Sequence, residues 1–473
     1  MKKIVVLGGG PAGITAAWVL ARQGKEVAVI EKAPHVGGLA ATFKRGDYLL
    51  DYGPHAFHIK EENLTELLKK ICGNDFRVIP TNTYVFLKGK YFKYPLQLSD
   101  ALMRLNPFLS AKMLLDYFGT SLKEKVKPTK SIDSFKDWGV KYFGKSLYNL
   151  CFGDYTERVW GMSAKLLSYK LAQQKLSKLN LGDIVKKLIG IKGKEQKAYF
   201  KSYIYPRGGV GTIFQNMASD ILRSGSEIYL NSEATEIRVD SDKKRVTKVF
   251  YESETGEQSL ECSAIISSIP INILTKLVTP PLDKKALESA DNLRFRDLIL
   301  VYLIVDKRRV TNFQWVYLLD NRFTFNRLTE QKNMSSDMLP EDKTALSLEL
   351  CCNEGDSRWK TDDEKYFEMA KQELNKLSLL NGAKIDDYFV IRVKNAYPIY
   401  DLNFDQKVDA IMAELSEVTN LLSVGRNGLF LNNDIHDSME MGLMASKHIL
   451  SNHWDSNEWF KKMQEYIRHK IES

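Results

Sequence analysis

Four residues near the start of the chain have the types and spacing of a nucleotide-binding turn. Gly8, Gly10 and Gly13 form the pattern G-x-G-x-x-G, and Glu31 follows eighteen residues after the last of them. In this pattern the first glycine allows a tight turn, the second lets a pyrophosphate approach the backbone, and the third lets a helix pack closely on a strand. Free N–H groups and the positive dipole end of that helix bind phosphates. An acid at Glu31 can accept hydrogen bonds from both ribose hydroxyls.

The elements that would position these residues flank them directly. Residues 4–7, Ile-Val-Val-Leu, are a short apolar run typical of a strand buried on both faces. Residues 14–21 have a helix pattern, and residues 27–30 predict a second strand that ends at Glu31. Strand, glycine turn, helix, strand and acid in this order predict a Rossmann-type dinucleotide-binding unit.

The residues around Glu31 bear on the choice of cofactor. An acid at this position disfavours a 2′-phosphate, so FAD or NAD is favoured over NADP. Residues 32–40, Lys-Ala-Pro-His-Val-Gly-Gly-Leu-Ala, resemble the second glycine turn of FAD-binding flavoenzymes of the amine oxidase type. NAD-dependent dehydrogenases have no reason to carry this turn. We therefore expect FAD, with NAD(P)H as a candidate external reductant.

Length, composition and charge limit the class of protein. The 473 residues predict two or three domains with sizeable cores, and 44% hydrophobic and 27% charged residues are ordinary for a soluble globular protein. The net charge of +9 favours anionic small-molecule ligands such as a nucleotide diphosphate, and it is compatible with weak contact to a membrane surface. No basic run interleaved with aromatic residues indicates nucleic-acid binding.

The cysteines and the hydropathy pattern predict the compartment. The five cysteines are scattered and form no C-x-x-C pair, which predicts buried thiols in a reducing compartment and no disulfide or metal site. The chain opens on a strand, and no apolar run reaches about 18 residues, so we expect neither a signal peptide nor an integral membrane segment. A cytoplasmic location is the resulting expectation.

The predicted fold class is α/β: a Rossmann-type FAD-binding domain with a helical insertion and a mixed β-sheet substrate domain. Trp459, Phe460 and Met463 give the tail an amphipathic stripe, which we expect to pack on the body; contact with a membrane surface is the alternative. The predicted parts are the FAD-binding domain in stretches 1–80, 201–275 and 401–450, the helical substrate or cap region 81–200, the β-sheet substrate domain 276–400, and the C-terminal amphipathic helix 451–473.

Several short segments resemble, in the same order along the chain, motifs of the UDP-galactopyranose mutases. Residues 53–58, Gly-Pro-His-Ala-Phe-His, look like the flavin-facing loop of the bacterial enzymes. As a colinear set the segments are specific for the superfamily that also holds amine and protoporphyrinogen oxidases. The other segments are Tyr94-Pro95-Leu96-Gln97, Tyr155 to Gly161, Tyr205 to Gly209, Phe325-Asn326-Arg327, Ala396-Tyr397-Pro398 and Gly425-Arg426-x-Gly428.

The resemblance implies an unusual chemistry. These mutases interconvert the pyranose and furanose forms of a nucleotide sugar in glycan biosynthesis without net redox change, and reduced flavin N5 attacks the anomeric carbon as UDP leaves. By position, the resemblance implies that His55 lies over the flavin ring and that Arg327 binds the diphosphate through a bidentate guanidinium fork. Tyr155, Tyr317 and Tyr397 would flank the diphosphate or hydrogen-bond to it.

Two departures from the mutase pattern leave the substrate open. Lys175 stands where the mutases place a second diphosphate arginine, and residues 430–433, Phe-Leu-Asn-Asn, stand where they carry an aromatic-Arg-Tyr run. Both changes fall at the anionic end of the substrate. A true FAD-dependent oxidoreductase that removes hydride from an amine, a sugar or an isoprenoid-like substrate is therefore the main alternative. A cofactor-bearing binding protein without turnover is a third.

These inferences predict two sets of site residues. Asp434, His436 and Asp437 are expected to form a polar loop that caps the following helix through Asp437 or Ser438, and not a metal site. The residues expected at the substrate are His55, Tyr155, Lys175, Tyr317, Arg327 and Tyr397. The residues expected to contact FAD are Gly8, Gly10, Pro11, Ala12, Gly13, Glu31, Lys32, Gly38, Leu39, Ala40, Gly53, Pro54, His55, Thr235, Gly425, Arg426, Ser438 and Met439.

Overall fold

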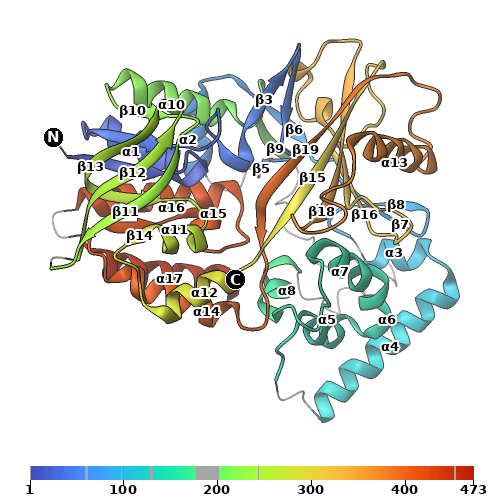
Figure 1. Ribbon diagram of the computed structural model, residues 1–473. Helices are drawn as coiled ribbons and strands as arrows, with labels where there is room; N and C mark the ends of the chain where they lie inside the picture. Colours follow the sequence, from blue (N-terminus) through green and yellow to red (C-terminus); the bar gives the residue numbers. More distant parts are fainter. Residues whose placement is uncertain are drawn as a thin grey trace.

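Two β-sheets stand side by side in this protein, and a group of helices closes one end of the second (Figure 1). This mixed α/β architecture confirms the predicted fold class. All five cysteines are buried and free, as their spacing predicts. The computed structural model describes residues 2–58, 62–96, 98–127, 131–176, 202–242, 244–451 and 454–472.

The first sheet contains the glycine-rich turn and draws its strands from separated stretches of the chain. Its strands are β1 (Lys3–Leu7), β2 (Val27–Ile30), β10 (Glu227–Tyr229), β11 (Glu233–Asp240), β12 (Arg245–Ser253), β13 (Gly256–Ser267), β14 (Val278–Thr279) and β20 (Leu421–Ser423). Their order is β10-β2-β1-β13-β12-β11-β14, and β20 pairs with β13. Strands β10, β2, β1, β13 and β20 run parallel, while β12 extends the sheet as an antiparallel hairpin. The predicted Rossmann unit is therefore present.

Helices cover both faces of this sheet, and one of them follows the glycine turn directly. That helix is α1 (Pro11–Arg22), which packs against both α10 (Thr212–Arg223) and α16 (Ile435–Leu450). A side chain at Gly442 of α16 would clash with the carbonyl of Ala12, so the two helices approach closely. The remaining helices of this half are α2 (Glu62–Cys72), α11 (Ile271–Leu277), α12 (Lys284–Asn292), α14 (Phe404–Ser416), α15 (Gly425–Gly428) and α17 (Ser456–Glu472).

The second sheet is mixed and carries α13 (Asp363–Lys376) on its outer face (Figure 1). Its strands are β7 (Tyr84–Leu87), β8 (Lys90–Lys93), β15 (Phe295–Val305), β16 (Trp315–Leu318), β17 (Arg327–Glu330), β18 (Thr344–Cys352) and β19 (Ile385–Pro398). Their order is β19-β15-β18-β17-β16-β7-β8, antiparallel except for the parallel pair β16–β7. Residues 84–93, which we assigned to the helical region, instead form the edge hairpin of this sheet.

The helical region begins at Leu98 and contains one π-helical turn, η2 (Asn149–Gly153). Residues 177–201 of the predicted helical stretch lie outside the described residues. Its helices are α3 (Leu98–Arg104), α4 (Pro107–Val126), α5 (Phe135–Phe143), α6 (Lys145–Tyr148), α7 (Asp154–Trp160) and α8 (Tyr169–Lys175). Short elements join the two halves: β3 (Thr42–Arg45), β4 (Tyr48–Asp51), β5 (Phe57–His58), β6 (Phe76–Pro80), β9 (Ser202–Pro206), η1 (Gly38–Ala40), η3 (Gln331–Asn333) and η4 (Ser336–Met338).

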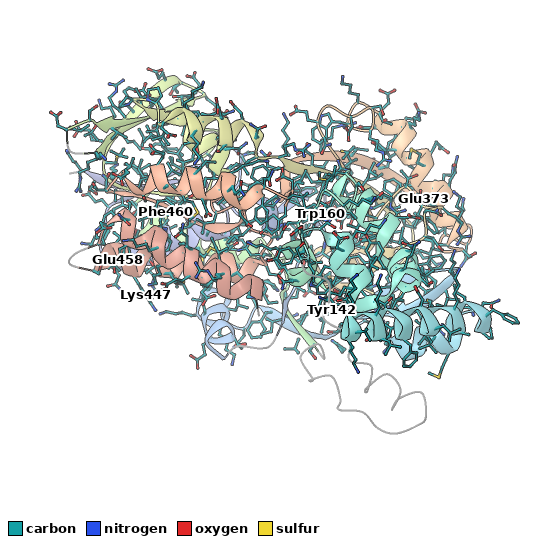
Figure 2. The ribbon with its side chains drawn as sticks, turned by 90° about the horizontal axis from the view of Figure 1, so that it is seen from below. Tyr142, Trp160, Glu373, Lys447, Glu458 and Phe460 are labelled. Atoms are coloured by element: carbon teal, nitrogen blue, oxygen red, sulfur yellow. The ribbon has the colours of Figure 1, made fainter. Side chains whose placement is uncertain are left out.

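The tail packs on the body, as predicted. Trp459, Phe460 and Met463 of α17 are buried, and Trp459 Nε1 donates a hydrogen bond of 3.0 Å to the carbonyl of Ser423 on β20. Phe460 is labelled in Figure 2. These three apolar side chains are therefore not available to a membrane surface, and the alternative interpretation of the tail is wrong for them. Among the described helices, none combines the length and the apolar character that a membrane span requires.

Candidate active site

The first glycine turn has the close geometry that its spacing predicts. Gly8 adopts a φ of +92°, a left-handed conformation that residues with a side chain avoid. A side chain at Gly13 would clash with the carbonyl of Gly8, so the start of α1 lies directly against the end of β1. The protein's own packing therefore accounts for both glycines.

Gly10 is different, because nothing in the protein requires a glycine there. Its φ of −71° is open to any residue, and a Cβ built on it would meet no atom within 4 Å. The first turn of α1 thus presents backbone N–H groups to open space. A pyrophosphate that approaches this backbone would fill the space, as expected for FAD.

Two later loops converge on this same turn. A Cβ at Gly38 would lie 3.2 Å from Cα of Gly10, and a Cβ at Gly425 would lie 2.8 Å from Cβ of Ala12. Both glycines have positive φ. The structure therefore brings together three predicted cofactor loops that are far apart in the sequence.

Glu31 uses both carboxylate oxygens at the end of β2. Its Oε2 accepts a hydrogen bond of 2.6 Å from the N–H of Gly9, and its Oε1 accepts one of 2.7 Å from the N–H of Ala33. These bonds hold the carboxylate beside the glycine turn. Each oxygen keeps a second lone pair, so the geometry leaves Glu31 able to accept hydrogen bonds from a ribose.

The other predicted cofactor residues lie in different environments. Lys32 is exposed and donates a hydrogen bond of 2.7 Å to Glu233, so its ammonium group points along the surface. Thr235 is exposed at an irregularity of β11. Ser438 and Met439 are buried in the first turns of α16. Of these four, only the two on α16 lie inside the protein.

His55 is a neutral histidine that faces two arginines. Burial, together with the charges of Arg327 and Arg426, lowers the pKa of His55 to about 4, although backbone hydrogen bonds with Leu39 and Tyr52 act in the opposite direction. Its Nε2 is buried and has no hydrogen-bond partner among the described residues. An orphaned ring nitrogen at this position fits a group that binds beside the 53–55 loop, such as a flavin ring.

Arg327 already has a carboxylate partner, which sequence reasoning missed. Its Nε and Nη2 donate hydrogen bonds of 2.7 and 2.6 Å to the two carboxylate oxygens of Glu349, its cross-strand neighbour on β18. The pair lies against Gly53, whose Cβ would be 3.1 Å from Glu349 Oε1. Two of the five N–H donors of the guanidinium are thus used, and Nη1 and the second N–H of Nη2 are left for the predicted fork toward a diphosphate. An acid in the apolar run of residues 345–351 was the signal that could have identified Glu349.

Three predicted tyrosines and one further tyrosine surround this ion pair. The guanidinium of Arg327 lies 5.7 Å from the ring centre of Tyr317, and the ring centres of Tyr317 and Tyr94 are 5.1 Å apart. Burial raises the pKa of Tyr155 well above its usual range and that of Tyr397 to about 12. Both hydroxyls are therefore neutral at physiological pH and able to donate hydrogen bonds. Tyr94 was part of a motif but was not predicted as a site residue.

Lys175 on α8 and Arg426 on α15 add two cations to this group of residues. Lys175 Nζ donates a hydrogen bond of 3.2 Å to the carbonyl of Asn432, and its side chain is exposed. Enough protein surrounds its ammonium group that desolvation lowers its pKa, while Asp434 opposes this shift. Arg426 donates to the carbonyl of Ala396 at 3.3 Å and lies 5.5 Å from the ring centre of Tyr397.

The six residues predicted at the substrate thus form one connected group. Arg327 interacts electrostatically with Tyr155, Tyr317 and Tyr397, and its charge reaches His55. The charge of Arg426 reaches both His55 and Lys175. The helical region, the second sheet and the glycine loops all contribute, so the group lies where the parts of the fold meet.

The polar loop before α16 is a helix cap, but its capping residue was predicted wrongly. Asp434, not Asp437 or Ser438, is the N-cap. In this capping box the N–H of Asp434 donates a hydrogen bond of 3.0 Å to the carboxylate of Asp437. Ligand atoms of Asp434, His436 and Asp437 lie within 4.8 Å of one another. Because both carboxylates serve the cap and the charge of Lys175 is near, we assign them to the helix terminus.

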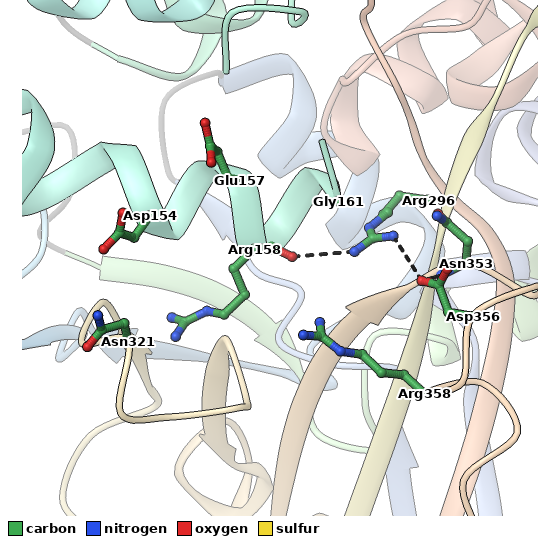
Figure 3. Close-up of a pocket in the computed structure, with 9 residues that line it drawn as sticks. All are labelled: Asp154, Glu157, Arg158, Gly161, Arg296, Asn321, Asn353, Asp356 and Arg358. Atoms are coloured by element: carbon green, nitrogen blue, oxygen red, sulfur yellow. Dashed lines mark hydrogen bonds and ion pairs between the residues drawn. The ribbon is translucent and has the colours of Figure 1, made fainter. Parts of the chain in front are cut away.

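A polar cavity of about 480 Å³ beside α7 shows how that helix is held (Figure 3). Arg158 donates hydrogen bonds to backbone carbonyls of residues 318–323. Arg296, only 2% exposed, donates to the carbonyls of Val159 at 2.8 Å and Cys351 at 3.0 Å. These bonds fix α7 against β18, and they therefore also position Tyr155, the predicted site residue on α7. No predicted site residue is among those lining the cavity: Asp154, Glu157, Arg158, Gly161, Arg296, Asn321, Asn353, Asp356 and Arg358.

Comparison with known proteins agrees with this geometry. A family model described as flavin containing amine oxidoreductase matches residues 11–393 of the chain. The chain belongs to this family of flavoenzymes. Membership implies FAD as the cofactor, and the open turn at Gly10 and the orphaned nitrogen of His55 fit it.

Individual relatives are more distant. The dTDP-fucopyranose mutase of Escherichia coli is 25% identical over 220 residues, 46% of this chain and 54% of that protein. An L-amino-acid oxidase of Crotalus adamanteus is 22% identical over 329 residues, 65% of this chain and 58% of its own length. The chain thus spans about half the length of the curated relatives it matches. The crystal structure of reduced UDP-galactopyranose mutase has the same fold, with a TM-score of 0.82 at 19% identity over 96% of this chain and 97% of that one.

The open space at Gly10 gives a direct test of the cofactor position in this flavoenzyme. We expect Gly10→Val to prevent FAD binding while the fold persists, because the new side chain would occupy space that contains no protein atom. Gly355→Val is the matched control, since Gly355 is equally open and has an ordinary φ. The measurement is flavin absorbance per purified chain, with circular dichroism to follow folding. A Gly10→Val protein that retains its flavin would place the cofactor elsewhere.

The lowered pKa of His55 predicts a pH dependence of stability. The unfolded chain takes up a proton at His55 below pH 6.5, whereas the folded chain resists it until about pH 4. Flavin-free wild type should therefore lose stability relative to His55→Gln as the pH falls through this window, by up to about 3 kcal/mol. Urea unfolding at a series of pH values measures the difference. Parallel pH profiles for the two proteins would contradict the neutral histidine.

Proposed function

We propose that this flavoenzyme is a mutase that interconverts ring forms of a nucleotide-linked sugar in glycan biosynthesis. Reduced flavin, when bound, supplies a nucleophilic N5 for the anomeric carbon. The protein's own residues have three tasks. They orient the sugar, they stabilise the departing nucleoside diphosphate, and they keep the imidazole and the tyrosine hydroxyls around the reacting atoms in their neutral forms.

The observation that carries the proposal is the set of cationic donors in the site. Arg327 and Arg426 act on His55, which burial and these two charges keep neutral, and Lys175 lies near Arg426. The two arginines are partly engaged within the protein, while Lys175 is exposed and bonded to one carbonyl. Glu349, Asp434 and Asp437 offset these three charges within the protein. The feature that suits a nucleoside diphosphate is therefore the set of N–H donors that the two arginines and Lys175 supply beside a neutral imidazole.

Neutral tyrosine hydroxyls complete the anion site. With the pKa values of Tyr155 and Tyr397 raised by burial, both hydroxyls keep their protons and can donate to phosphate oxygens. A phenolate would repel the same ligand. The names of the relatives support a sugar nucleotide, because the matched Escherichia coli protein is a dTDP-fucopyranose mutase.

Two observations favour the alternative, an FAD-dependent oxidoreductase. Glu349 occupies one edge of Arg327 and offsets its charge at close range. Residues 430–433, which stand where the mutases carry an aromatic-Arg-Tyr run, are all buried. A site with fewer free anion contacts is compatible with a neutral or cationic hydride donor. The matched L-amino-acid oxidase belongs to that class by name.

A single assay separates the two functions. The flavin is reduced anaerobically with dithionite or NAD(P)H, UDP-, GDP- and dTDP-sugars are added, and the products are resolved by chromatography. A product isomeric with its substrate, formed only with reduced flavin, is the expected result. If every sugar returns unchanged while an amine or another donor bleaches the oxidised flavin, the oxidoreductase function replaces the mutase.

Lys175 provides the sharpest variant for the anion site, because it is exposed and not part of a buried ion pair. Lys175→Ala should weaken the affinity for the nucleoside diphosphate by about 10- to 100-fold, the usual effect of losing a hydrogen bond to a charged group. Lys175→Arg should restore most of it, and FAD content should not change. Lys170→Ala, on the same helix but paired with Asp405, is the control. Unchanged affinity in Lys175→Ala would remove this lysine from the site.

A further inference from the structure

Helix α4 carries an apolar surface that is exposed among the described residues. We call this surface the α4 stripe. Its side chains are 47–87% exposed, whereas Ser110 and Met113 on the opposite face are buried. Figure 1 shows α4 along the lower right edge of the molecule, with α5 and α6 on its inner side. The stripe consists of Phe108 (87% exposed), Leu115 (74%), Phe118 (47%), Leu122 (65%) and Val126 (79%).

The spacing of these residues places them on one side of the helix. At 3.6 residues per turn, the stripe from Phe108 to Val126 falls within an arc of about 80° and runs the length of the helix. This is a continuous apolar face rather than a set of scattered exposed residues. Such a face on a soluble chain marks a surface of interaction.

The charged residues of α4 are also divided between its exposed and its packed side. Lys125 lies on one side of the stripe, and Lys112 and Lys123 lie on the other; all three are exposed. The two acids of the helix are engaged with the protein: Asp116 accepts a hydrogen bond from the N–H of Ser146, and Glu124 pairs with Lys141 at 3.3 Å. The free side of α4 is therefore apolar in the centre and positive at both margins.

This combination points to an anionic lipid surface. An apolar face flanked by lysines is the pattern of a helix that lies in the plane of a membrane, with its apolar side chains among the acyl chains and its lysines at the headgroups. A two-fold contact between copies of this chain would bring the same lysine-flanked faces together and oppose like charges. We propose that α4 binds the surface of an anionic bilayer through the α4 stripe and its flanking lysines.

The position of α4 relative to the fold agrees with this role. No described helix qualifies as a membrane span, and Trp459, Phe460 and Met463 of the tail are buried, so neither feature competes with α4 as the point of contact. The net charge of +9 would draw the whole chain toward the same surface.

The test uses the full FAD-loaded chain and vesicle sedimentation. Vesicles are made of phosphatidylcholine alone or of phosphatidylcholine mixed with phosphatidylserine. Wild type should bind the mixed vesicles, and salt should weaken the binding. The double variant Leu115→Gln with Leu122→Gln should bind at least about tenfold more weakly. Leu222→Gln on α10, also an exposed leucine, is the matched control and should bind as wild type does.

A second pair of variants measures the contribution of the flanking lysines to vesicle binding. Lys123→Gln with Lys125→Gln should weaken binding to the mixed vesicles by about fivefold per lysine. Lys461→Gln with Lys462→Gln, both exposed on α17, should have little effect. FAD absorbance per chain should be unchanged in every variant, which separates loss of binding from loss of fold.

Three results would overturn the proposal. One is a wild type that does not sediment with either vesicle. Another is a stripe variant that binds mixed vesicles as tightly as wild type. The third is a stripe variant that converts a dimer to a monomer in light scattering without a change in vesicle binding, since the stripe would then join two copies of the chain.

Discussion

One buried residue, Asp51, links the second sheet to short elements that lie between the two sheets. Asp51, at the end of β4, accepts hydrogen bonds through its side chain from the hydroxyls of Thr42 and Tyr205, and its carbonyl accepts one of 2.6 Å from Tyr302 on β15. It is fully buried, and burial raises its pKa to about 6 despite these bonds. A buried acid is tolerated only when its acceptors are used, and each acceptor here is used by a different segment. Asp51 therefore connects the second sheet to these short elements.

The cofactor loops depend on close backbone approach in a comparable way. Gly8 and Gly13 are required by the protein's own packing, whereas a side chain at Gly10 would meet no protein atom within 4 Å, which leaves room for the proposed pyrophosphate. This contrast distinguishes a structural glycine from one retained for binding. Gly38 and Gly425 bring two further loops to the same turn, so the proposed flavin contacts come from sequence positions hundreds of residues apart.

At the proposed substrate end, the protein balances positive charge against the cost of burying it. Arg327 is nearly enclosed, and Glu349 neutralises it in the absence of a ligand. Such a pair is stable because neither charge is left alone, but it lowers the attraction for an incoming anion. Among the described residues Lys175 forms no ion pair, and its side chain is exposed, so it is the proposed cation most able to respond to a diphosphate.

The sequence by itself determined the dinucleotide-binding unit, the α/β class and the packing of the tail. These follow from local patterns: a glycine spacing with flanking strands, and the apolar stripe around Trp459. The resemblance to the mutases suggested the six residues proposed to contact the substrate, but it could not reveal that Glu349 binds Arg327, because their contact is set by the register of two strands. The edge hairpin of residues 84–93 was assigned to the helical region because its pairing partner, β16, lies more than two hundred residues away. Only the tertiary structure decided which apolar helix face remains exposed: α17 and α4 are both amphipathic, and burial depends on whether another element packs against the face.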